Sequence, residues 1–370
     1  MANIVPAAIA REPWALILPI TGLVLFGGAV LYSAAGGSMS PWATTHIMRF
    51  FVFLAMAFVI SRFTADFMKM MALPVYVVLI VLLVAVETIG QLGGGSQRWL
   101  NLGFMTLQPS ELMKPGIVLI LAWFYASLPV GMTKEWRSLM IPGALIGLPV
   151  ALVLLQPDLG TSLALVAGGA IVLFLAGLPM KWFVGAGTAG LAAIPALFFF
   201  ALHDYQRKRV LTFLDPESDP LGAGYHITQS KIAIGSGGIF GKGFGNGSQS
   251  HLDYLPEPHT DFVFATMAEE WGLVGGIFVI FIFGWVLRWG LGVAKRGPDR
   301  FSRILAAGLA FTIFFYVAVN LMMVMGLAPV VGIPLPFMSH GGSSMMTIMI
   351  CLGMIMAVNR WSQRSTSSFE

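Results

Sequence analysis

Charged residues are scarce in this sequence: Asp, Glu, Lys and Arg together make up only 10% of its 370 residues. Soluble globular domains carry about 25%. Hydrophobic residues instead account for 57% of the chain, and the mean hydropathy is +0.83. This combination excludes an ordinary soluble protein and predicts an integral membrane protein.

The sequence has a single cysteine, no cluster of basic residues and no internal repeat. The single cysteine, Cys351, lies in an apolar run, so no internal disulfide can form and we expect a buried thiol. The net charge is +4, but the basic residues are scattered singly, so we expect no nucleic-acid partner. The lack of a repeat argues against the two-halved architecture of many transporters.

Long apolar windows are abundant, and about 20 apolar residues are enough to cross the hydrocarbon core of a bilayer. The sequence therefore predicts an all-α integral membrane protein with ten transmembrane helices, in which residues 1–370 form a single polytopic membrane domain. A long extracytoplasmic loop, about 203–260, separates spans seven and eight. The ten windows lie near 14–35, 46–64, 72–90, 111–129, 138–155, 160–178, 182–202, 261–289, 303–326 and 341–359.

The distribution of Lys and Arg predicts the orientation of these spans. With the N-terminus inside, three basic residues fall in the short outer loops, namely Arg49, Arg98 and Lys114. Thirteen fall in inner segments: Arg11, Arg62, Lys69, Lys134, Arg137, Lys181, Arg288, Lys295, Arg296, Arg300, Arg303, Arg360 and Arg364. Basic residues favour the cytoplasmic side, so we expect a cytoplasmic (inner) membrane protein with both termini in the cytoplasm.

Polar side chains collect near the predicted outer ends of the spans. Ionisable groups are costly in lipid, so each of them is a functional candidate by default. If the helices pack as a bundle, these groups converge on one outward-opening polar cavity. They come from three stretches, "GGGSQRWLNLGFMTLQPSELMKP", "LQPDLGTS" and "PFMSHGGSS", and include Arg98, Trp99, Glu111, Lys114, Asp158, Thr161, Ser162, Ser339, His340, Ser343 and Ser344.

Each of these candidates also has a structural interpretation. Glu111 and Lys114 are spaced i to i+3 and could simply pair with each other. Trp99 could be an interfacial aromatic, Asp158 a helix cap, and His340 a partner for backbone groups at a helix start. The spacings do not fit a structural zinc site.

The run "AIGSGGIFGKGFGNGSQS" suggests a nucleotide site, but it does not match one. A P-loop requires Gly at position 236 and Ser or Thr at position 243, where this chain has Ser and Gly. We expect a flexible outer loop rich in turns, whose backbone amides could approach a phosphate or a sugar.

The stretch "LPEPHTDFVFATMAEEWG" places three acids at the start of an apolar helix. After two prolines, Thr260 is the expected N-cap and Asp261 falls in the first helical turn, where the helix dipole would stabilise it. Glu269 and Glu270 lie about 12 Å further along at 1.5 Å per residue, where we expect them to pair inside the bundle.

Several motifs resemble, in order, those of the SEDS (shape, elongation, division and sporulation) family of peptidoglycan polymerases. They are "GSQRWL", "QPSELMK", "QPDLGTS", "RVLTFLDP", the stretch from "GYHITQSKIAIGSGG" to "EEWGLVGG", and "PFMSHGGSS", and they cover essentially the whole chain. The stretch "TQSKIAIGSGG" and the short N-terminal tail look more like the elongation members than the division members.

This resemblance implies a peptidoglycan glycosyltransferase that polymerises lipid II, the undecaprenyl-pyrophosphate-linked disaccharide-pentapeptide, at the outer membrane face during elongation of rod-shaped cells. It implies that Asp261 is the essential loop aspartate, and that Glu111, Lys114 and Asp158 are sensitive cavity positions. The candidate substrate-binding residues are Arg98, Trp99, Glu111, Lys114, Asp158, Arg209, His259, Ser339, His340 and Ser343.

The chemistry of glycosyl transfer assigns roles to these groups. A base must take the proton of the attacking hydroxyl, and Asp261 is the best-placed carboxylate. Arg98, Lys114 and Arg209 are the candidate cations for the pyrophosphate, and the metal requirement is left open between no cofactor and a divalent cation, Mg or Mn.

Two other functions remain open, and the resemblance adds partners. A lipid II flippase would have a cavity accessible from both sides, and a scaffold for cell-wall enzymes would tolerate cavity substitutions. The family implies a class B penicillin-binding protein as the transpeptidase partner, with other elongation-complex proteins. We expect it to contact the outer loop and the lipid-facing surface of spans eight and nine.

Overall fold

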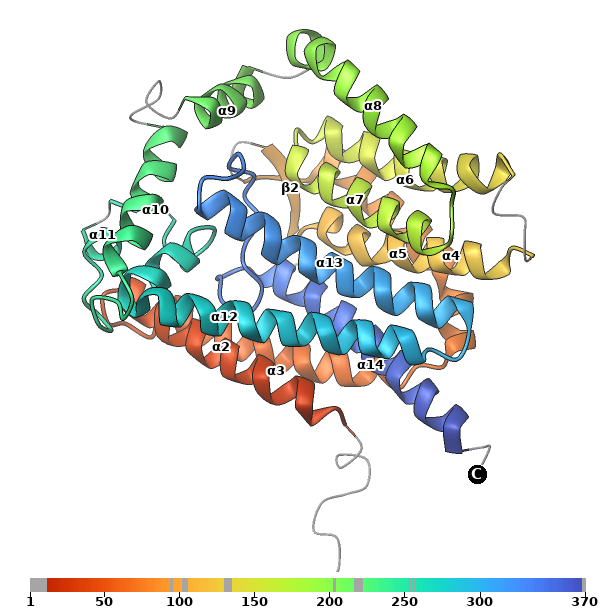
Figure 1. Cartoon of the computed structure of the whole chain (residues 1–370), viewed down its shortest axis with the longest axis horizontal. Helices are drawn as coiled ribbons and strands as arrows, with labels where there is room; N and C mark the ends of the chain where they lie inside the picture. Colours follow the sequence, from red (N-terminus) through yellow and green to blue (C-terminus); the bar gives the residue numbers. More distant parts are fainter. Residues whose placement is uncertain are drawn as a thin grey trace, which may run out of the picture.

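The computed structural model describes residues 12–93, 96–101, 106–129, 135–201, 204–215, 222–252, 254–255 and 257–367. Within these ranges, each of the ten predicted windows is occupied by a helix (Figure 1). They are α2 (Trp14–Ala34), α3 (Trp42–Ile60), α4 (Ala65–Ile89), α5 (Pro109–Ser127), α6 (Arg137–Leu155), α7 (Leu159–Leu175), α8 (Met180–Ala196) with a π-helical end η2 (Leu197–Ala201), α12 (Val263–Arg296), α13 (Arg300–Val324) and α14 (Gly342–Ser367).

Seven helices of the described ranges are long and apolar enough to cross a membrane, namely α2, α3, α4, α6, α12, α13 and α14. α7 is apolar but has only 17 residues, and α5 carries the ionisable Glu111 and Lys114. These helices support an integral membrane protein. The number of spans and the orientation of the termini stay predictions.

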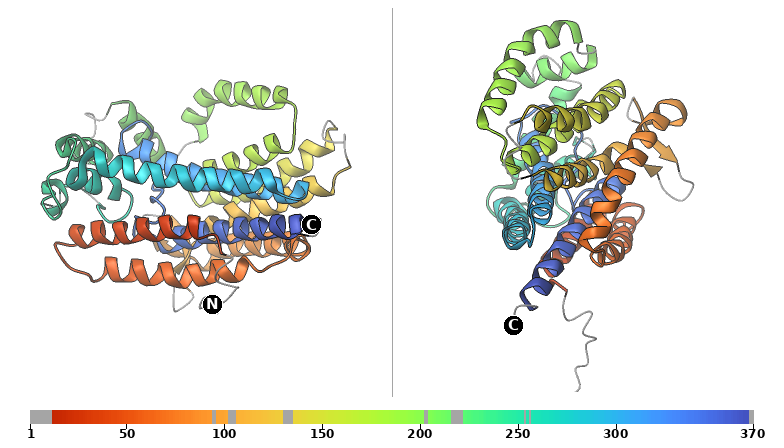
Figure 2. Two further views of the ribbon diagram at one scale, coloured as in Figure 1. Left: turned by 60° about the horizontal axis from the view of Figure 1, so that its bottom comes forward. Right: turned by 90° about the vertical axis from the view of Figure 1, so that its right-hand side faces the viewer.

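α14 runs through the bundle and α8 lies at its edge. α14 packs on α3, α5, α12 and α13 (Figure 2). Nearly all of its apolar window is buried. α5 packs on α4, α7 and α13. In contrast, α8 buries none of its described side chains. The polar residues of α5 are therefore held against the centre of the bundle.

The predicted extracytoplasmic loop, about 203–260, is largely helical where it is described. It contains α9 (Asp204–Leu214), α10 (Ala223–Gly237) and the short α11 (Ser248–His251). α10 packs against α12, and the Ser230 hydroxyl donates a 2.7 Å hydrogen bond to the Val324 carbonyl at the end of α13. Ile227 and Ala233 of α10 are buried, so this part of the loop is anchored on the bundle.

α12 is two helices joined at Gly272, whose φ of 62° is not helical. The stretch after the break, 273–296, is by itself long enough to span a bilayer at 1.5 Å per residue. The apolar start of the predicted window 261–289 therefore lies on the short helix before the break. Glu269 and Glu270 lie on that short helix, and both are buried.

The glycine-rich run closes against this break. The backbone N–H groups of Lys242 and Gly243 donate hydrogen bonds of 3.0 Å to the Glu269 and Glu270 carbonyls, and the N–H of Leu273 donates to Gly238 at 2.9 Å. A Cβ on Gly272 would lie 2.4 Å from the Gly241 nitrogen. The two amides at 242 and 243 thus satisfy helix-end carbonyls and are not available to a phosphate.

Side chains reinforce this contact, and the two expected partners of buried groups, Glu269 and Glu270, bond to different segments. Glu269 accepts hydrogen bonds from Lys242 Nζ at 2.5 Å, from the Ser248 hydroxyl at 3.0 Å and from the backbone N–H of Gln249. Glu270 accepts a hydrogen bond from the Ser33 hydroxyl of α2. The two glutamates therefore hold the segment after α10 against α12.

Candidate active site

One polar cavity of about 440 Å³ lies where a small sheet, α5, α7 and two loops meet. The sheet has the order β1 (Gln91–Gly93), β2 (Ser96–Asn101) and β3 (Thr106–Leu107), with antiparallel neighbours. The loops are those before α12 and α14. The lining residues are Arg98, Trp99, Gln108, Glu111, Asp158, Thr161, Glu257, Thr260, Asp261, Gly332, Pro334, His340, Gly341, Gly342, Ser343 and Ser344.

The position of Asp261 is set by contacts with α13 and with the loop before α14. The Asn320 side-chain amide of α13 donates hydrogen bonds of 2.9 Å to the Asp261 carbonyl and 2.8 Å to the Ile333 carbonyl. The buried Ser339 hydroxyl donates to the Thr260 carbonyl at 2.6 Å and accepts from the Leu335 N–H at 2.8 Å. Ser339 therefore holds the turn rather than lining the cavity.

Asp261 lies in a turn, not in the first turn of the helix. α12 begins at Val263, with Phe262 as its N-cap residue, and the Thr260 hydroxyl bonds to Glu257 instead of capping the helix. The helix-start expectation was wrong because the turn is pinned by Asn320 and continues two residues further.

The Asp261 carboxylate is partly buried, and among the described residues no hydrogen bond reaches it. Burial first, and then the nearby Glu257 carboxylate, raise the pKa of Asp261 from 3.8 to about 6, while the Arg209 guanidinium opposes the rise. A carboxylate with a pKa near 6 is a better base than an ordinary aspartate and is still mostly ionised at pH 7.

Glu111 lines the cavity from α5, and Lys114 lies behind it. Lys114 Nζ donates to Glu111 Oε1 at 2.5 Å and to the Tyr316 hydroxyl of α13 at 2.8 Å. The Tyr316 hydroxyl in turn donates to Glu111. All three side chains are buried. Glu111 and Lys114 therefore form a structural pair, and Glu111 also faces the cavity.

Asp158 likewise combines a structural role with a place on the cavity wall. Its carboxylate accepts the backbone N–H of Thr161 at 3.1 Å and the Thr161 hydroxyl at 2.9 Å, which caps α7. Arg98 lies 3.5 Å from Asp158 and donates to the Pro157 carbonyl at 2.8 Å. The next residue along β2, Trp99, also lines the cavity.

The two predicted histidines border this site in different ways. His340 and Ser343 line the cavity, and His340 Nε2 lies 3.4 Å from the Arg49 guanidinium. His259 does not line it, because its ring stacks on Trp42 at 3.9 Å between ring centres. Burial lowers the pKa of both histidines below 6.5, so both rings are mostly neutral at pH 7.

Arg209 is close to the cavity but outside it. It lines a smaller hollow of about 130 Å³ that shares Arg98 and Asp158 with the polar cavity. Its guanidinium donates to the Val330 carbonyl at 3.2 Å. Among the described residues, no group of three or more His, Cys, Asp or Glu side chains could hold a metal ion.

Sequence reasoning missed four contributors: Gln108 and Glu257 in the wall, and Asn320 and Tyr316 behind it. Asn320 carried a usable signal, since a polar residue in an apolar span is a functional candidate. Glu257 stands four residues before Asp261 in a polar loop, where acids are common. Only the folded turn shows that it faces the same cavity.

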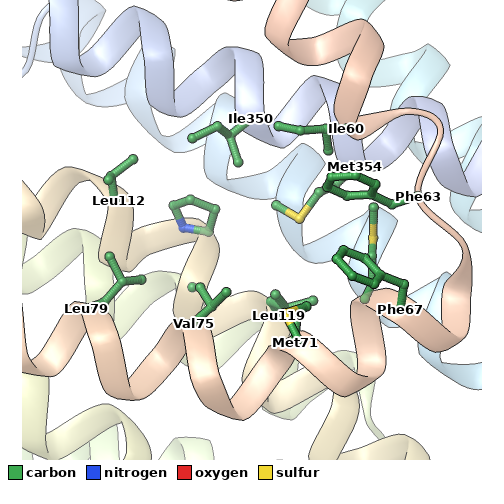
Figure 3. A pocket seen from close by; sticks show the side chains of 13 residues that line it. Ile60, Phe63, Phe67, Met71, Val75, Leu79, Leu112, Leu119, Ile350 and Met354 are labelled. Carbon is green, nitrogen blue, oxygen red and sulfur yellow. The ribbon is translucent and has the colours of Figure 1, made fainter.

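A second hollow of about 360 Å³ is lined by apolar side chains and lies between α3, α4, α5 and α14 (Figure 3). Leu112 follows Glu111 on α5, so the hollow begins beside the polar cavity. Phe63 and Phe67 line it where α3 ends and α4 begins. A polar cavity and an apolar hollow therefore share α5.

Comparison with known proteins places the whole chain in one family. Residues 12–364 match the family FTSW_RODA_SPOVE, described as "Cell cycle protein". The chain is 43% identical over 350 residues to peptidoglycan glycosyltransferase MrdB of Escherichia coli, covering 93% of this chain and 92% of MrdB. It is 36% identical over 284 residues to stage V sporulation protein E of Bacillus subtilis, covering 77% of each chain.

Solved structures agree with this assignment. A chain from a structure described as "Structural coordination of polymerization and crosslinking by a peptidoglycan synthase complex" is 31% identical, with a TM-score of 0.80, covering 95% of this chain and 98% of that one. The rod shape determining protein RodA of Thermus thermophilus is 28% identical, with a TM-score of 0.71, covering 95% and 97% of the two chains.

Proposed function

The chain belongs to the FtsW, RodA and SpoVE family of cell cycle proteins, and we propose that it polymerises lipid II into glycan strands with Asp261 as the base. It is a peptidoglycan glycosyltransferase with a role in cell elongation, as the resemblance implied. The observation that carries the proposed site is the Asp261 carboxylate, which faces a polar cavity with a pKa raised to about 6.

The reaction joins a sugar hydroxyl to an anomeric carbon. As the hydroxyl oxygen bonds to that carbon, its proton passes to Asp261, and the bond from the carbon to the pyrophosphate oxygen breaks. The freed pyrophosphate carries the negative charge away with the undecaprenyl chain. Trp99 and Ser343 line the same cavity and would contact the sugars.

Arg98 is the cation best placed for the pyrophosphate. Its side chain is partly exposed in the cavity wall, and its partner Asp158 lies 3.5 Å away. Lys114, in contrast, is buried and held by Glu111 and Tyr316. Arg209 reaches only the adjoining hollow. Adding and chelating Mg²⁺ or Mn²⁺ in the polymerisation assay would decide whether a divalent cation assists Arg98.

The apolar hollow suits the hydrocarbon part of this substrate. Lipid II carries its reactive head and its undecaprenyl tail on one molecule, and the two hollows adjoin through Glu111 and Leu112 of α5. An isoprenoid chain in this hollow would replace lipid contacts with contacts to Met71, Leu79 and Leu119. Ten spans would place the polar cavity on the outer face and both termini in the cytoplasm.

The partner is a class B penicillin-binding protein, whose transpeptidase crosslinks the new strand. One similar solved structure is a peptidoglycan synthase complex that coordinates polymerisation and crosslinking. The proposed contact surfaces are the segment from α9 to α11 and the exposed sides of α12 and α13.

Glycan synthesis from purified lipid II tests this function. Wild type with a partner carrying an inactive transpeptidase site should give long strands. Asp261→Asn should reduce the rate about 100- to 10,000-fold, the usual contribution of a general base. Asp66→Asn, an exposed aspartate in the first turn of α4, is the matched control and should keep full activity.

Each result is decisive. Full polymerisation by a folded Asp261→Asn protein would remove Asp261 as the base. No polymer from wild type, together with lipid II translocation in vesicles, would favour a flippase instead. Activity that survives cavity substitutions while the complex still assembles would favour a scaffold.

A further inference from the structure

A basic and aromatic face lies at the end of α12 furthest from Asp261. Three cations and two tryptophans line a surface hollow of about 600 Å³ that α12 alone provides. The hollow's lining is Gly284, Trp285, Leu287, Arg288, Trp289, Leu291, Gly292, Lys295 and Arg296. We call Trp285, Arg288, Trp289, Lys295 and Arg296 the basic face.

The three cations of the basic face point away from α13. A Cβ on Gly290 would lie 3.0 Å from the Ala310 methyl, so position 290 faces α13. At about 100° per residue, Arg288 and Lys295 lie roughly 140–160° around the helix from position 290. Both side chains are exposed, as is Arg296. The basic face is therefore separate from the surface that α12 presents to α13.

The three cations of the basic face have no acidic partner in the part of the chain that the structure describes. At the same end of the bundle, Glu12 pairs with Arg62 and Arg360, and Asp299 pairs with Lys69 at 2.7 Å. Glu12 and Asp299 are thus already paired with other cations, and the positive charge of the basic face is available to an anionic group.

Arg288 would be costly in this position without such a group. With the near edge of the hydrocarbon core placed at Leu273, Arg288 lies about 22 Å along the helix from that edge. It would then fall roughly 8 Å short of the far edge of a 30 Å core. Ionisable residues in spans usually face the bundle interior, but the Arg288 side chain is exposed on the outside of α12. Its long stem can carry the guanidinium toward the headgroups, where it needs an anion.

The arrangement of the neighbouring side chains suits a phosphate group. A Cβ on Gly292 would lie 3.5 Å from Arg296 Nη1, so the guanidinium folds back over the glycine toward Arg288. The Trp285 indole is fixed by a 2.8 Å hydrogen bond from Nε1 to the Ala15 carbonyl of α2.

We propose that the basic face binds the phosphate headgroup of an anionic phospholipid, with Arg288, Lys295 and Arg296 as its cationic contacts. Charge complementarity selects this occupant, because the negative charge of an anionic headgroup would pair with the three cations. The acyl chains of the same lipid would cover the adjoining apolar surface of Leu287 and Leu291. The site is distinct from the polar cavity, since it lies at the opposite end of α12.

Native mass spectrometry of the purified full-length protein tests this site by counting retained lipids. Phosphatidylglycerol should bind more tightly than phosphatidylcholine. Arg288→Gln should weaken phosphatidylglycerol about fivefold, and the triple change with Lys295→Gln and Arg296→Gln should weaken it more than about 100-fold. Arg288→Lys should keep most of the affinity, because the charge remains.

The control is Lys181→Gln, which removes an exposed cation from α8 and should leave the lipid preference unchanged. Equal loss from this control would mean that only overall charge matters and would overturn the site. So would a triple variant that elutes as wild type and still prefers phosphatidylglycerol. If inorganic phosphate at the same concentration displaced the bound phosphatidylglycerol, the basic face would be a site for free phosphate instead of a lipid.

Discussion

The side-chain amide of Asn320 donates a 2.9 Å hydrogen bond to the backbone carbonyl of Asp261. Asn320 lies on the buried face of α13, near the end of the helix, whereas Asp261 lies in a turn between α11 and α12. The same amide also holds the Ile333 carbonyl. One buried residue therefore fixes the position of the proposed base relative to the loop before α14.

Replacing Asn320 with Leu should displace Asp261 without removing it. Two carbonyls lose their donor, each at a cost of about 1–3 kcal/mol, so we expect a lower Tm and a kcat reduced more than KM is changed. Steady-state polymerisation measures kcat and KM, and thermal unfolding measures Tm. Thr347→Val is the control, since that buried hydroxyl has no hydrogen-bond partner among the described residues, and it should leave both quantities unchanged.

The rate of polymerisation should depend on pH through Asp261. The base acts as the carboxylate, so the single-turnover rate should fall as the pH drops through about 6. Glu257→Gln removes a nearby negative charge that raises this pKa, so the midpoint should move to lower pH. A midpoint that stays in place in Glu257→Gln would contradict the proposed coupling.

Asp261→Asn should be more stable than wild type at neutral pH. The pKa of Asp261 is raised in the folded state, so its contribution to stability is fully present below its unfolded value of 3.8 and is lost as the pH rises through about 6. Asparagine has no charge to bury at any pH. The Tm difference should therefore grow between about pH 3.8 and 6, be complete above pH 6 and vanish at lower pH; a difference independent of pH would argue against a buried carboxylate.

Lys114 and Glu111 should show strong coupling in a double-mutant cycle. Lys114→Met leaves the Glu111 charge buried without its cation, which should cost about 3–5 kcal/mol. Adding Glu111→Gln removes that charge and should restore much of the stability. Additive effects of the two changes on the free energy of unfolding would mean that the pair does not interact as its geometry indicates.

Gly272→Ala should open the contact between the glycine-rich run and α12. Position 272 has φ 62°, and the added Cβ would lie 2.4 Å from the Gly241 nitrogen. We expect a lower Tm and faster proteolysis near residues 238–249. Gly22→Ala in α2 is the matched control, since nothing lies within 4 Å of its added Cβ. Equal proteolysis of both variants would show that the break needs no glycine.

The sequence by itself determined the membrane class, the ten helical windows and the residues that line the cavity walls on β2, α5 and α7. Apolar run length and the cost of charge in lipid are local properties, so they can be read without a fold. Arg98, Glu111, Asp158 and Asp261 were found in this way, and the structure brings all four to one cavity.

Only the tertiary structure decided what each polar group faces. The break at Gly272, the turn that holds Asp261 and the burial of Lys114 behind Glu111 all depend on contacts between segments far apart in the chain. An apolar stretch looks the same before and after a helix break, and a lysine looks the same whether it meets substrate or a buried tyrosine. The role of each group is decided by the residue that it contacts in the folded chain: Gly241, Asn320 and Tyr316 in these three cases.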